Sequence, residues 1–526
     1  MKRKEVRNIR NRALNKEDKR GGEKMQLKRA KILLSVVIVA GLLFTSALAL
    51  AQTRIRVLML TSPAMTALRD MVPEFEKKYP DIKVVWEDTA YADIHTKEMN
   101  DFIAHTGRYD VIQMDNPWLP EYAGGGFIEN LEPWIKKAGL RLWKDNVRKW
   151  PPGVEMYPTI YLEDEIVPVL NFYGNWKGNL YAIPNMPGVQ LLYYRKDLFE
   201  DPQEKAKFMA EYGYELQVPK TWKQLYDVAE FFTRPPNLYG LTWSAGKGNM
   251  AVQNYYNIAW SWGADCLAFG QGFPDPDDPI HNMPICNSPI GVKALEFFCS
   301  LKPFMPPGVA AYEWAEITSD FIQGKAAMMF QWSDFVRDVE DPAKSKVAGK
   351  VGYALMPGNP DAPVNNVPGI IPGEGYASLG GWALVMNKDS RNKEAAWKFI
   401  GWASCLTMNY DEMMDYLEVG GTNTGRKSGY FIPETTGYKV GRYPIELEMY
   451  REHIRRRPAI AEEVEYEIIV GTEVQKAFIG AKTPKQALDD AAKAMYELMV
   501  RGGYIPKGQP LVWPSKYVNP DGTKAY

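Results

Sequence analysis

Histidine and cysteine are both scarce in this chain, with four of each among 526 residues. The histidines are scattered, and the cysteine spacings match no zinc or redox pattern, which argues against a metal centre. The sequence also has no Gly-x-Ser-x-Gly elbow, no phosphate loop of the Gly-x4-Gly-Lys-Ser/Thr type and no His-Glu-x-x-His helix. We therefore predict no metal, no cofactor and no enzymatic activity. A glycosidase with two carboxylates far apart in sequence stays an alternative.

Positive charge is scarce outside the N-terminal segment. Residues 1–51 carry thirteen Lys and Arg against four Asp and Glu, so the formal total of −1 leaves the rest of the chain at −10. A body this acidic has no surplus of positive charge with which to hold phosphate backbones. The charge distribution predicts no binding to nucleic acid.

The N-terminal segment has the order of a secretory signal. Residues 32–51 are uncharged and mostly apolar, follow a basic cluster at 28–31 and end in Ala-Leu-Ala. This order predicts a signal peptide over 1–51, with Met25 as a second candidate for the translation start. An uncleaved membrane anchor is the alternative. No cysteine directly follows the apolar run, so we expect a periplasmic or secreted protein rather than a lipoprotein.

An oxidising compartment favours disulfides among the cysteines of the exported part. Cys266 and Cys286 bracket a loop rich in Pro, Asp and Gly. They are therefore the favoured pair, with a loop-closure contribution of about 3 kcal/mol. Four buried free thiols, including Cys299 and Cys405, are the alternative.

Strand and helix signals alternate after the N-terminal segment. Residues 55–60 form a short apolar run typical of a strand buried on both faces, and residues 63–79 carry apolar side chains at helical spacing. Further strand signals at 82–86 and 110–114 enclose a helical stretch at 97–104. This alternation predicts an α/β fold with a largely parallel sheet, in which ligands collect at the carboxyl ends of strands.

The loop after the third strand signal carries ligand-binding chemistry. Asp115, Asn116 and Trp118 supply a carboxylate, an amide and an indole where a ligand would approach. A helix-capping loop with Trp118 packed beneath it is the alternative. Residues 357–381 are rich in Gly, Pro and Asn and lack periodicity. They predict a long loop, beyond the usual limit of about 12 to 15 residues, which points to a functional role.

Eight segments follow one another in an order that is characteristic as a set. They are FEKKYP from Phe75, DVIQMDNPWLPEYAGGGFIENLEPWI from Asp110, NLYAIP from Asn179, LLYYRKDLF from Leu191, PKTWKQLYDVA from Pro219, FIQGKAAMMFQW from Phe321, GGWALVMNKDSRNKEAAWKFIGWAS from Gly380 and TPKQALDDAAKAM from Thr483. Each is weak alone. In this order they resemble the extracellular solute-binding proteins of ABC importers, in the family that includes maltose-binding protein.

The resemblance implies a fold and a division of the chain. The expected fold is α/β, the two-lobed periplasmic-binding-protein fold of type II, with hinge-linked lobes around a central cleft. Lobe 1 would comprise residues 53–186 plus 380–441, and lobe 2 residues 187–379 plus 442–526. A ligand that touches both lobes only in the closed state would shift the population toward closure.

The resemblance also implies ligand-binding residues. Asp115, Asn116 and Trp118 occupy the cleft loop that contacts ligand in sugar-binding relatives. Trp332 falls where maltose-binding relatives place a stacking aromatic ring. Tyr466 falls near a second such aromatic, and Asn185 falls at the crossing into the second lobe. Trp382 and Arg426 follow a Gly-Gly turn and a Gly-rich loop that face the cleft in many members. Trp243 and Asn254 correspond more loosely to ligand contacts of relatives.

These observations predict the high-affinity capture of a carbohydrate, either an oligosaccharide or a polyol. A monomer would deliver it to the permease subunits of an ABC transporter. Pro117 and Trp118 stand where maltose-binding relatives have charged residues, which argues against maltose itself. One alternative is a non-sugar solute, such as a peptide, a polyamine or a phosphorylated polyol. The other is a secreted carbohydrate-active enzyme. The extra length at 143–167 and beyond Tyr504 has no predicted role.

Overall fold

The computed structural model describes residues 52–145, 159–362, 369–371, 373–408, 412, 425–430 and 442–512. The predicted signal peptide and its alternative, a membrane anchor, lie outside these residues. Within them, no helix combines the length and the apolar character that crossing a bilayer requires.

The chain divides into two compact units, residues 1–54 with 76–83 and residues 55–75 with 84–526. In the described part of the smaller unit, the Thr53 N–H donates to the Asp81 carbonyl oxygen at 2.8 Å. The Lys83 ammonium pairs with Glu76 at 2.6 Å. The larger unit contains the cavity described in the next subsection.

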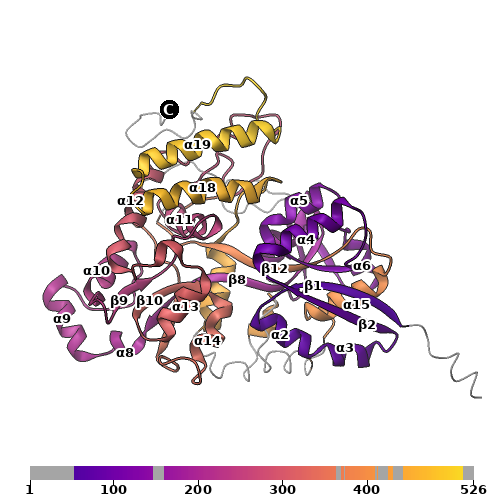
Figure 1. Ribbon diagram of the computed structural model, residues 1–526, viewed down its shortest axis with the longest axis horizontal. Helices are drawn as coiled ribbons and strands as arrows, with labels where there is room; N and C mark the ends of the chain where they lie inside the picture. Colours follow the sequence, from indigo (N-terminus) through magenta and orange to yellow (C-terminus); the bar gives the residue numbers. More distant parts are fainter. Residues whose placement is uncertain are drawn as a thin grey trace, which may run out of the picture. The chain divides into compact units, whose positions relative to one another are not determined.

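A mixed sheet runs through the structure in the order β2-β1-β3-β12-β8-β10-β9, with β11 paired to β8 and β13 paired to β12 (Figure 1). Pairing is parallel between β1 and β3, between β9 and β10 and between β12 and β13. It is antiparallel where β12 meets β3 and β8 and where β8 meets β10 and β11. The strands are β1 (Thr53–Leu60), β2 (Ile82–Thr89), β3 (Val111–Asp115), β8 (Ala182–Arg195), β9 (Tyr239–Thr242), β10 (Ala326–Trp332), β11 (Val351–Ala354), β12 (Ala377–Met386) and β13 (Ile454–Arg455).

The prediction of a largely parallel sheet is therefore wrong for the centre of the sheet. Local strand-helix-strand order does produce the parallel pair β1 and β3, as crossover connections require. Strand β12, however, comes from a distant part of the chain and runs antiparallel to both β3 and β8. The sequence near residues 377–386 does not predict that this strand runs antiparallel to its two partners.

Strand β8 links the two ends of the sheet. Its first part, up to Val189, pairs with β12, and its second part, from Gln190, pairs with β10 and β11. The pairing with β12 shifts register between Trp382 and Ala383. Pro187, which has no N–H to donate, lies opposite Gly381, whose φ is +89°. A Cβ on Gly381 would lie 2.3 Å from the Met186 carbonyl oxygen, so this close approach requires glycine.

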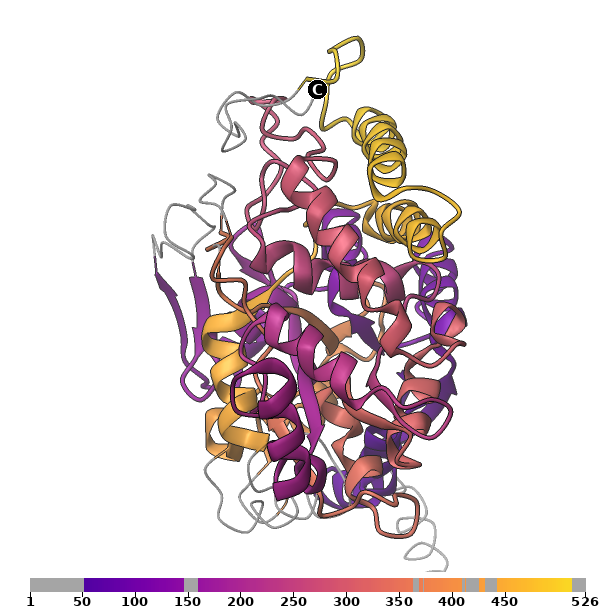
Figure 2. The same ribbon diagram turned by 90° about the vertical axis from the view of Figure 1, so that its left-hand side faces the viewer.

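Helices flank the strands. α10 and α13 pack beside β9 and β10, α15 packs on β12, and α18 packs on both α11 and α19 (Figure 1, Figure 2). The helices of at least seven residues are α2 (Pro63–Asp70), α3 (Val72–Lys78), α4 (Tyr91–Ile103), α7 (Val167–Gly174), α9 (Pro202–Tyr212), α10 (Trp222–Phe232), α11 (Asn249–Ser261), α12 (Pro289–Ser300), α13 (Trp314–Ile322), α15 (Lys393–Ala403), α17 (Arg442–Glu448), α18 (Glu463–Phe478) and α19 (Pro484–Arg501). The shorter ones are α5 (Leu119–Gly124), α6 (Glu132–Lys137), α8 (Lys196–Phe199) and α14 (Val336–Glu340).

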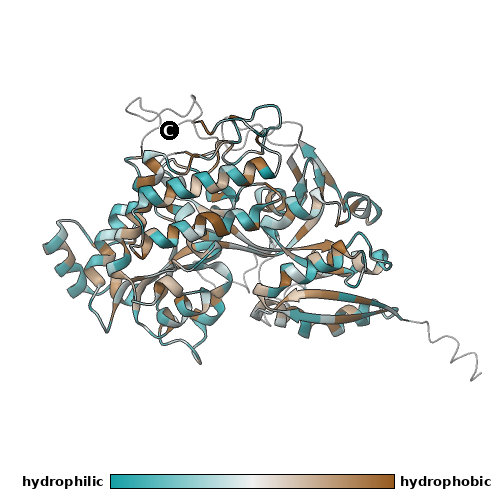
Figure 3. Cartoon of the chain, turned by 45° about the horizontal axis from the view of Figure 1, so that its top comes forward, coloured by the Kyte–Doolittle hydropathy of each residue, from teal (hydrophilic) through white to brown (hydrophobic). Residues whose placement is uncertain are grey.

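Local sequence explains where several helices begin. Thr221 before α10 and Thr483 before α19 each form a capping box with a glutamine three residues later. Ser288 accepts a hydrogen bond from the Gly291 N–H and caps α12. The strands are largely hydrophobic in Figure 3, and the helices alternate hydrophilic and hydrophobic residues, as expected for helices with one buried face.

Two expectations from sequence need correction. The loop predicted over 357–381 ends earlier, because β12 begins at Ala377 and pairs with β13 and β8. The favoured disulfide between Cys266 and Cys286 is also wrong, since no disulfide joins the four cysteines, all of which lie within the described residues. The segments of Cys266 and Cys286 are nevertheless adjacent, because the Cys266 carbonyl accepts from the Ile285 N–H at 2.8 Å.

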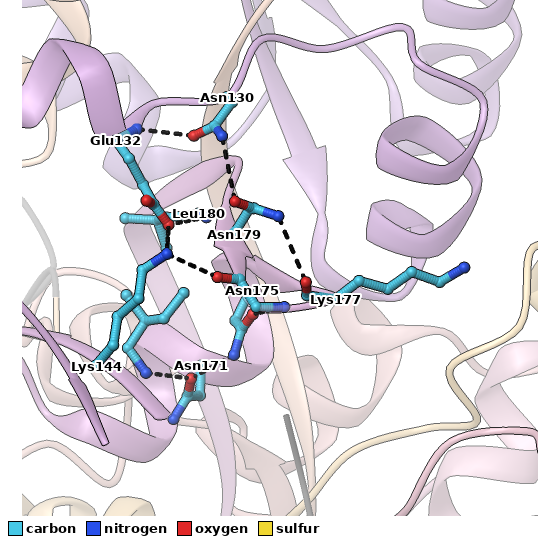
Figure 4. A network of polar contacts seen from close by, with 10 residues as sticks. Asn130, Glu132, Lys144, Asn171, Asn175, Lys177, Asn179 and Leu180 are labelled. Carbon is cyan, nitrogen blue, oxygen red and sulfur yellow. Dashed lines mark hydrogen bonds and ion pairs between the residues drawn. The ribbon is translucent and has the colours of Figure 1, made fainter. Parts of the chain in front are cut away.

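The extra length near residue 143 forms an anchored hairpin of β4 (Leu142–Asp145) and β5 (Thr159–Leu162). Lys144 pairs with Glu132 at 2.6 Å and donates to the Gly178 carbonyl at 2.9 Å. Asn171 accepts from the Ile160 N–H at 3.1 Å, within the asparagine-rich network of Figure 4. This network ties the hairpin to α6, α7 and the small β6–β7 hairpin (Asn175–Trp176 and Asn179–Leu180).

Candidate ligand-binding cavity

A cavity of about 470 Å³ opens where β1 and β3 end and β8, β10 and β12 meet. Its volume lies within the range of pockets that hold small molecules. The polar and aromatic residues that line it are Thr61, Ser62, Tyr91, Asp115, Asn249, Gln253, Trp314, Trp332, Asp334, Phe335, Arg337, Asp338, Trp382 and Arg457.

Aromatic rings form much of the lining. Tyr91, the first residue of α4, meets Trp382 edge-on at 5.9 Å between ring centroids and Trp314 at 5.3 Å. Trp332 ends β10, and its indole lies directly against β12, because a Cβ on Gly380 would lie 2.4 Å from two of its ring atoms. Flat apolar surfaces of this kind suit the C–H faces of a small ligand.

Gln331 positions two of these tryptophans. Its side-chain amide donates to the Trp314 carbonyl at 2.9 Å, and its side-chain oxygen accepts from the Trp332 N–H at 2.9 Å. The amide also donates to Thr318 at 2.9 Å, so all the bonds of this buried side chain stay within β10 and α13. A fully bonded buried amide of this kind holds its neighbours in fixed positions.

Asp115 lies at the floor of the cavity, where the register of β3 and β12 places it opposite Trp382. The Tyr91 hydroxyl donates to its Oδ2 at 3.2 Å, and Arg457 Nη2 lies 3.5 Å from Oδ1. Among the described residues, no hydrogen-bond donor serves Oδ1. Burial raises the pKa of Asp115 to about 6, although Arg457 and Tyr91 favour the charged form and oppose the shift.

Arg457 completes the floor from the other side. Its Nη1 donates to Glu467 at 2.6 Å, and its Nε lies 3.9 Å from Glu463, both on α18. Burial lowers the pKa of Arg457, but the carboxylates of Glu467, Glu463 and Asp115 raise it more, so it stays above its usual value. Burial also raises the pKa of Glu463, and neighbouring Glu467 adds to the effect.

Tyr91 connects this floor to α11. Its hydroxyl accepts a hydrogen bond from Asn249 Nδ2 at 2.8 Å while it donates to Asp115. One phenol therefore joins the start of α4, the end of β3 and the start of α11 around a single cavity.

Three residues predicted from sequence, Asp115, Trp332 and Trp382, line this cavity. Asn116 and Trp118 lie just behind it. Asn116 donates to the Leu379 carbonyl at 3.0 Å, and the Trp118 ring meets Trp382 edge-on at 5.7 Å. Both are buried and neither lines the cavity, so their role as ligand contacts stays a prediction.

The other five candidates lie outside the cavity lining, each with partners of its own. Asn185 faces Gln113, Asn254 bonds Gln190 and the Ser244 carbonyl, Trp243 packs on Phe330, Arg426 pairs with Asp164 and Glu165, and the Tyr466 hydroxyl bonds that of Tyr256. Contact between these residues and a ligand stays a prediction.

Sequence reasoning missed Tyr91, Trp314, Asn249 and Arg457. The signal for Arg457 was present, because three consecutive arginines at 455–457 precede an acidic helix start at 462–467. All three are buried, which is rare for arginine without partners. Such a run followed by glutamates predicts a buried ion-pair cluster, although it does not say which cavity the cluster faces.

The described residues contain no group of three or more His, Cys, Asp or Glu side chains suited to a metal ion. The cavity instead combines aromatic faces with a few fixed polar groups. This arrangement can hold a small polar molecule by stacking and hydrogen bonding.

The sequence profile of the bacterial extracellular solute-binding proteins matches residues 61–404. The chain therefore belongs to this family and has the two-lobed α/β fold of type II periplasmic binding proteins.

The chain is similar to the mannitol-binding protein of Pseudomonas aeruginosa, with 26% identity over 84% of this chain and 92% of that protein. It is also similar to a probable amino-acid ABC transporter periplasmic-binding protein of Sinorhizobium fredii, with 22% identity over 86% and 90%. Among solved structures, the solute-binding protein of Agrobacterium radiobacter in complex with ribitol has a TM-score of 0.67 and 27% identity. That match covers 85% of this chain and 99% of the other.

Proposed function

We propose that this protein captures an extracellular carbohydrate, with a polyol as the favoured class, and delivers it to the permease subunits of an ABC transporter. One observation carries the proposal. Trp332 and Trp382 supply aromatic surfaces in the cavity that also holds Asp115 and Arg457. Sugars and polyols present C–H groups to flat rings, and their hydroxyl groups require fixed hydrogen-bonding partners.

The comparisons support the same ligand class. The relative named for mannitol and the structure with ribitol are both above 25% identical and span most of the chain. Mannitol and ribitol are uncharged linear polyols, and a cavity of about 470 Å³ has room for molecules of that size.

Capture would proceed by closure of two lobes. We place residues 53–186 plus 380–441 in lobe 1 and residues 187–379 plus 442–526 in lobe 2, with β8 and β12 as hinge strands. Asp115 and Tyr91 would then face Trp332 and Asn249 across the cleft. A ligand that touches both sides stabilises the closed state over the open one.

Location and assembly follow from the same proposal. The periplasmic-binding relatives agree with export by a signal peptide over 1–51 and with a periplasmic or secreted site of action. We propose that the protein acts as a monomer without a cofactor and leaves its ligand chemically unchanged.

The test is calorimetry and thermal melting with ribitol, D-mannitol, maltose and monosaccharides. We expect at least one polyol to bind and raise the melting temperature, with the ligand recovered intact. Trp332→Ala should weaken that binding at least tenfold, because it removes an aromatic surface. Trp143→Ala, in the β4–β5 hairpin away from the cavity, serves as the matched control and should bind normally. Release of a new product, or an unchanged affinity in Trp332→Ala, would contradict the proposal.

An amino acid is the second candidate ligand. Asp115 and Arg457 place opposite charges side by side in the cavity, and a zwitterion carries one charge of each sign. The relative named as a probable amino-acid binder points the same way. A calorimetric panel of the twenty amino acids separates the two candidates, since tight binding of one of them without polyol binding would favour the second.

A further inference from the structure

We propose that Arg457 is a specificity-determining residue that, together with Asp115, holds one hydroxyl group of an uncharged polyol. The hydroxyl donates to Asp115 Oδ1 and its oxygen accepts from Arg457 Nη2. The inference rests on the proposed function and names how the same cavity recognises its ligand.

The two side chains are close enough for one hydroxyl oxygen, placed beside the pair, to lie within hydrogen-bond distance of both. Arg457 Nη2 and Asp115 Oδ1 lie 3.5 Å apart, yet Oδ1 has no hydrogen-bond donor among the described residues. Asp115 is only 5% exposed and lines the cavity, so its Oδ1, which accepts no hydrogen bond, is shielded from bulk water. A buried acceptor without a partner is costly, and a ligand group that supplies the missing donor gains that free energy.

A hydroxyl group suits the Asp115–Arg457 pair better than a charged group does. The donor it must face is a guanidinium, and the acceptor beside it is a carboxylate. A hydroxyl donates and accepts through one oxygen, so it satisfies both at once. An ammonium group offers donors only and a phosphate offers mainly acceptors, so each would leave one partner facing a like charge.

The surrounding charges also disfavour an anion. The cavity lining carries three carboxylates and two guanidinium groups, from Asp115, Asp334, Asp338, Arg337 and Arg457. Glu463 and Glu467 add two more carboxyl groups around Arg457. A phosphorylated polyol would therefore enter a cavity in which Arg457 is already paired and acidic groups outnumber basic ones.

Arg457 is held firmly enough to discriminate between ligands. Glu467 fixes its Nη1 at 2.6 Å. Its two neighbours hold the backbone, because Arg455 donates to the Gly369 carbonyl at 2.9 Å and the Arg456 guanidinium lies 3.9 Å from the centroid of the Phe273 ring. A donor fixed before the ligand arrives loses little entropy on binding.

The test starts with the unaltered protein and calorimetry. D-mannitol and ribitol are the probes, with monodeoxy derivatives of whichever polyol binds and with its terminal phosphate. We expect removal of one particular hydroxyl to cost at least tenfold in affinity and the phosphate to bind at least a hundredfold more weakly. Equal affinity for every deoxy derivative, tighter binding of the phosphate, or tighter binding of a cation such as putrescine would overturn the inference.

Arg457→Lys then assigns the effect to this residue. A lysine keeps the positive charge but cannot serve Glu467 and a hydroxyl through a planar fork. We expect polyol affinity to fall at least tenfold and the penalty for deleting the recognised hydroxyl to shrink to less than threefold. Arg442→Lys is the matched control, since Arg442 is also buried and paired with a glutamate, Glu446, but does not line the cavity, and it should keep both values.

The outcomes separate the two proposals. If no sugar or polyol binds the unaltered protein, the proposed function fails. If a polyol binds but Arg457→Lys keeps the full deoxy penalty, only the inference about Arg457 fails. Should Arg457→Lys not fold, Asp115→Asn probes the same hydroxyl from the carboxylate side. In Asp115→Asn, the loss of affinity caused by removing the recognised hydroxyl must shrink as well. If that loss persists in full, Asp115 and Arg457 do not share the contact.

Discussion

Asp115 is the side chain on which most of the cavity's polar contacts converge. Tyr91 and Arg457 approach its two oxygens, and Glu463 and Glu467 face it from α18 across the guanidinium. Because burial raises the pKa of Asp115 to about 6, the charge of this carboxyl changes close to physiological pH.

Polyol affinity should depend on pH through this residue. A ligand hydroxyl that donates to Asp115 prefers the ionised carboxylate, so binding lowers the pKa of Asp115. By linkage, affinity then rises with pH through about 6 and falls below it. At most, each pH unit below 6 should cost about tenfold in affinity. Calorimetry with D-mannitol or ribitol from pH 5 to pH 8 measures the slope.

Asp115→Asn is the control for the pH dependence, because an amide keeps an acceptor oxygen and does not titrate in this range. Its affinity should be lower than that of the unaltered protein at pH 8 and nearly constant from pH 5 to pH 8. A slope that persists in Asp115→Asn would assign the titration to another group, such as Glu463.

At the scale of elements, β12 matters because its glycines let an aromatic ring touch the strand. The Trp332 indole lies against Gly380, and Gly188 lies opposite Gly380 on β8. Because neither glycine has a side chain, the Trp332 ring at the end of β10 packs directly on the backbone of β8 and β12.

Gly380→Ala should disturb the site through Trp332. The new methyl group would lie 2.4 Å from two indole atoms, so the ring must move out of its place in the cavity. We expect polyol affinity to fall at least tenfold and the free energy of unfolding to drop by about 1 to 3 kcal/mol, as in other overpacked sites. Calorimetry and urea denaturation measure the two effects.

Gly124→Ala is the comparison, since its methyl group would meet only ordinary contacts at 3.8 Å or more and lies outside the cavity lining. Its ligand affinity should not change. If Gly380→Ala also binds normally, the position of the Trp332 ring does not govern recognition.

Local sequence predicts the elements better than their pairing. The apolar runs at 55–60 and 110–114 are strands in the structure, and the helical stretch at 97–104 lies in α4 except for its last residue. The antiparallel course of β12 escapes prediction, because its partners in β3 and β8 are distant in sequence. Periodicity reports which face of an element is buried but not which strand lies beside it.

The same limit applies to the site. Asp115 could be predicted from its position directly after a clear strand signal, whereas Trp332 and Trp382 were predicted only from the family resemblance. Tyr91, Asn249 and Arg457 begin a helix or follow a short strand, and they reach the cavity only through long-range packing. The spacing of these three residues in the sequence does not predict that they line the same cavity.

At the scale of the whole molecule, the proposed lobes meet through Tyr91 as well as through β8 and β12. The Tyr91 hydroxyl bonds both Asp115 of proposed lobe 1 and Asn249 of proposed lobe 2, and its ring packs against Trp314 of lobe 2. A contact across the cleft that forms only on closure adds to the stability of the closed state, whatever the ligand.

Tyr91→Phe should therefore weaken closure without removing an aromatic wall. The phenylalanine ring keeps the contacts with Trp382 and Trp314 but loses both hydrogen bonds, each worth about 0.5 to 1.5 kcal/mol. We expect ligand to dissociate about tenfold faster in stopped-flow tryptophan fluorescence, with a small change in the association rate, because related complexes differ mainly in dissociation. X-ray scattering should show a larger radius of gyration for the variant at subsaturating ligand and equal radii at saturation.

Asn249→Ala, which removes the other partner of the same bond, should reproduce this effect. The double variant should be little worse than Tyr91→Phe alone, since both changes break one contact. Fully additive effects, or unchanged dissociation in Tyr91→Phe, would mean that this tyrosine does not join the lobes.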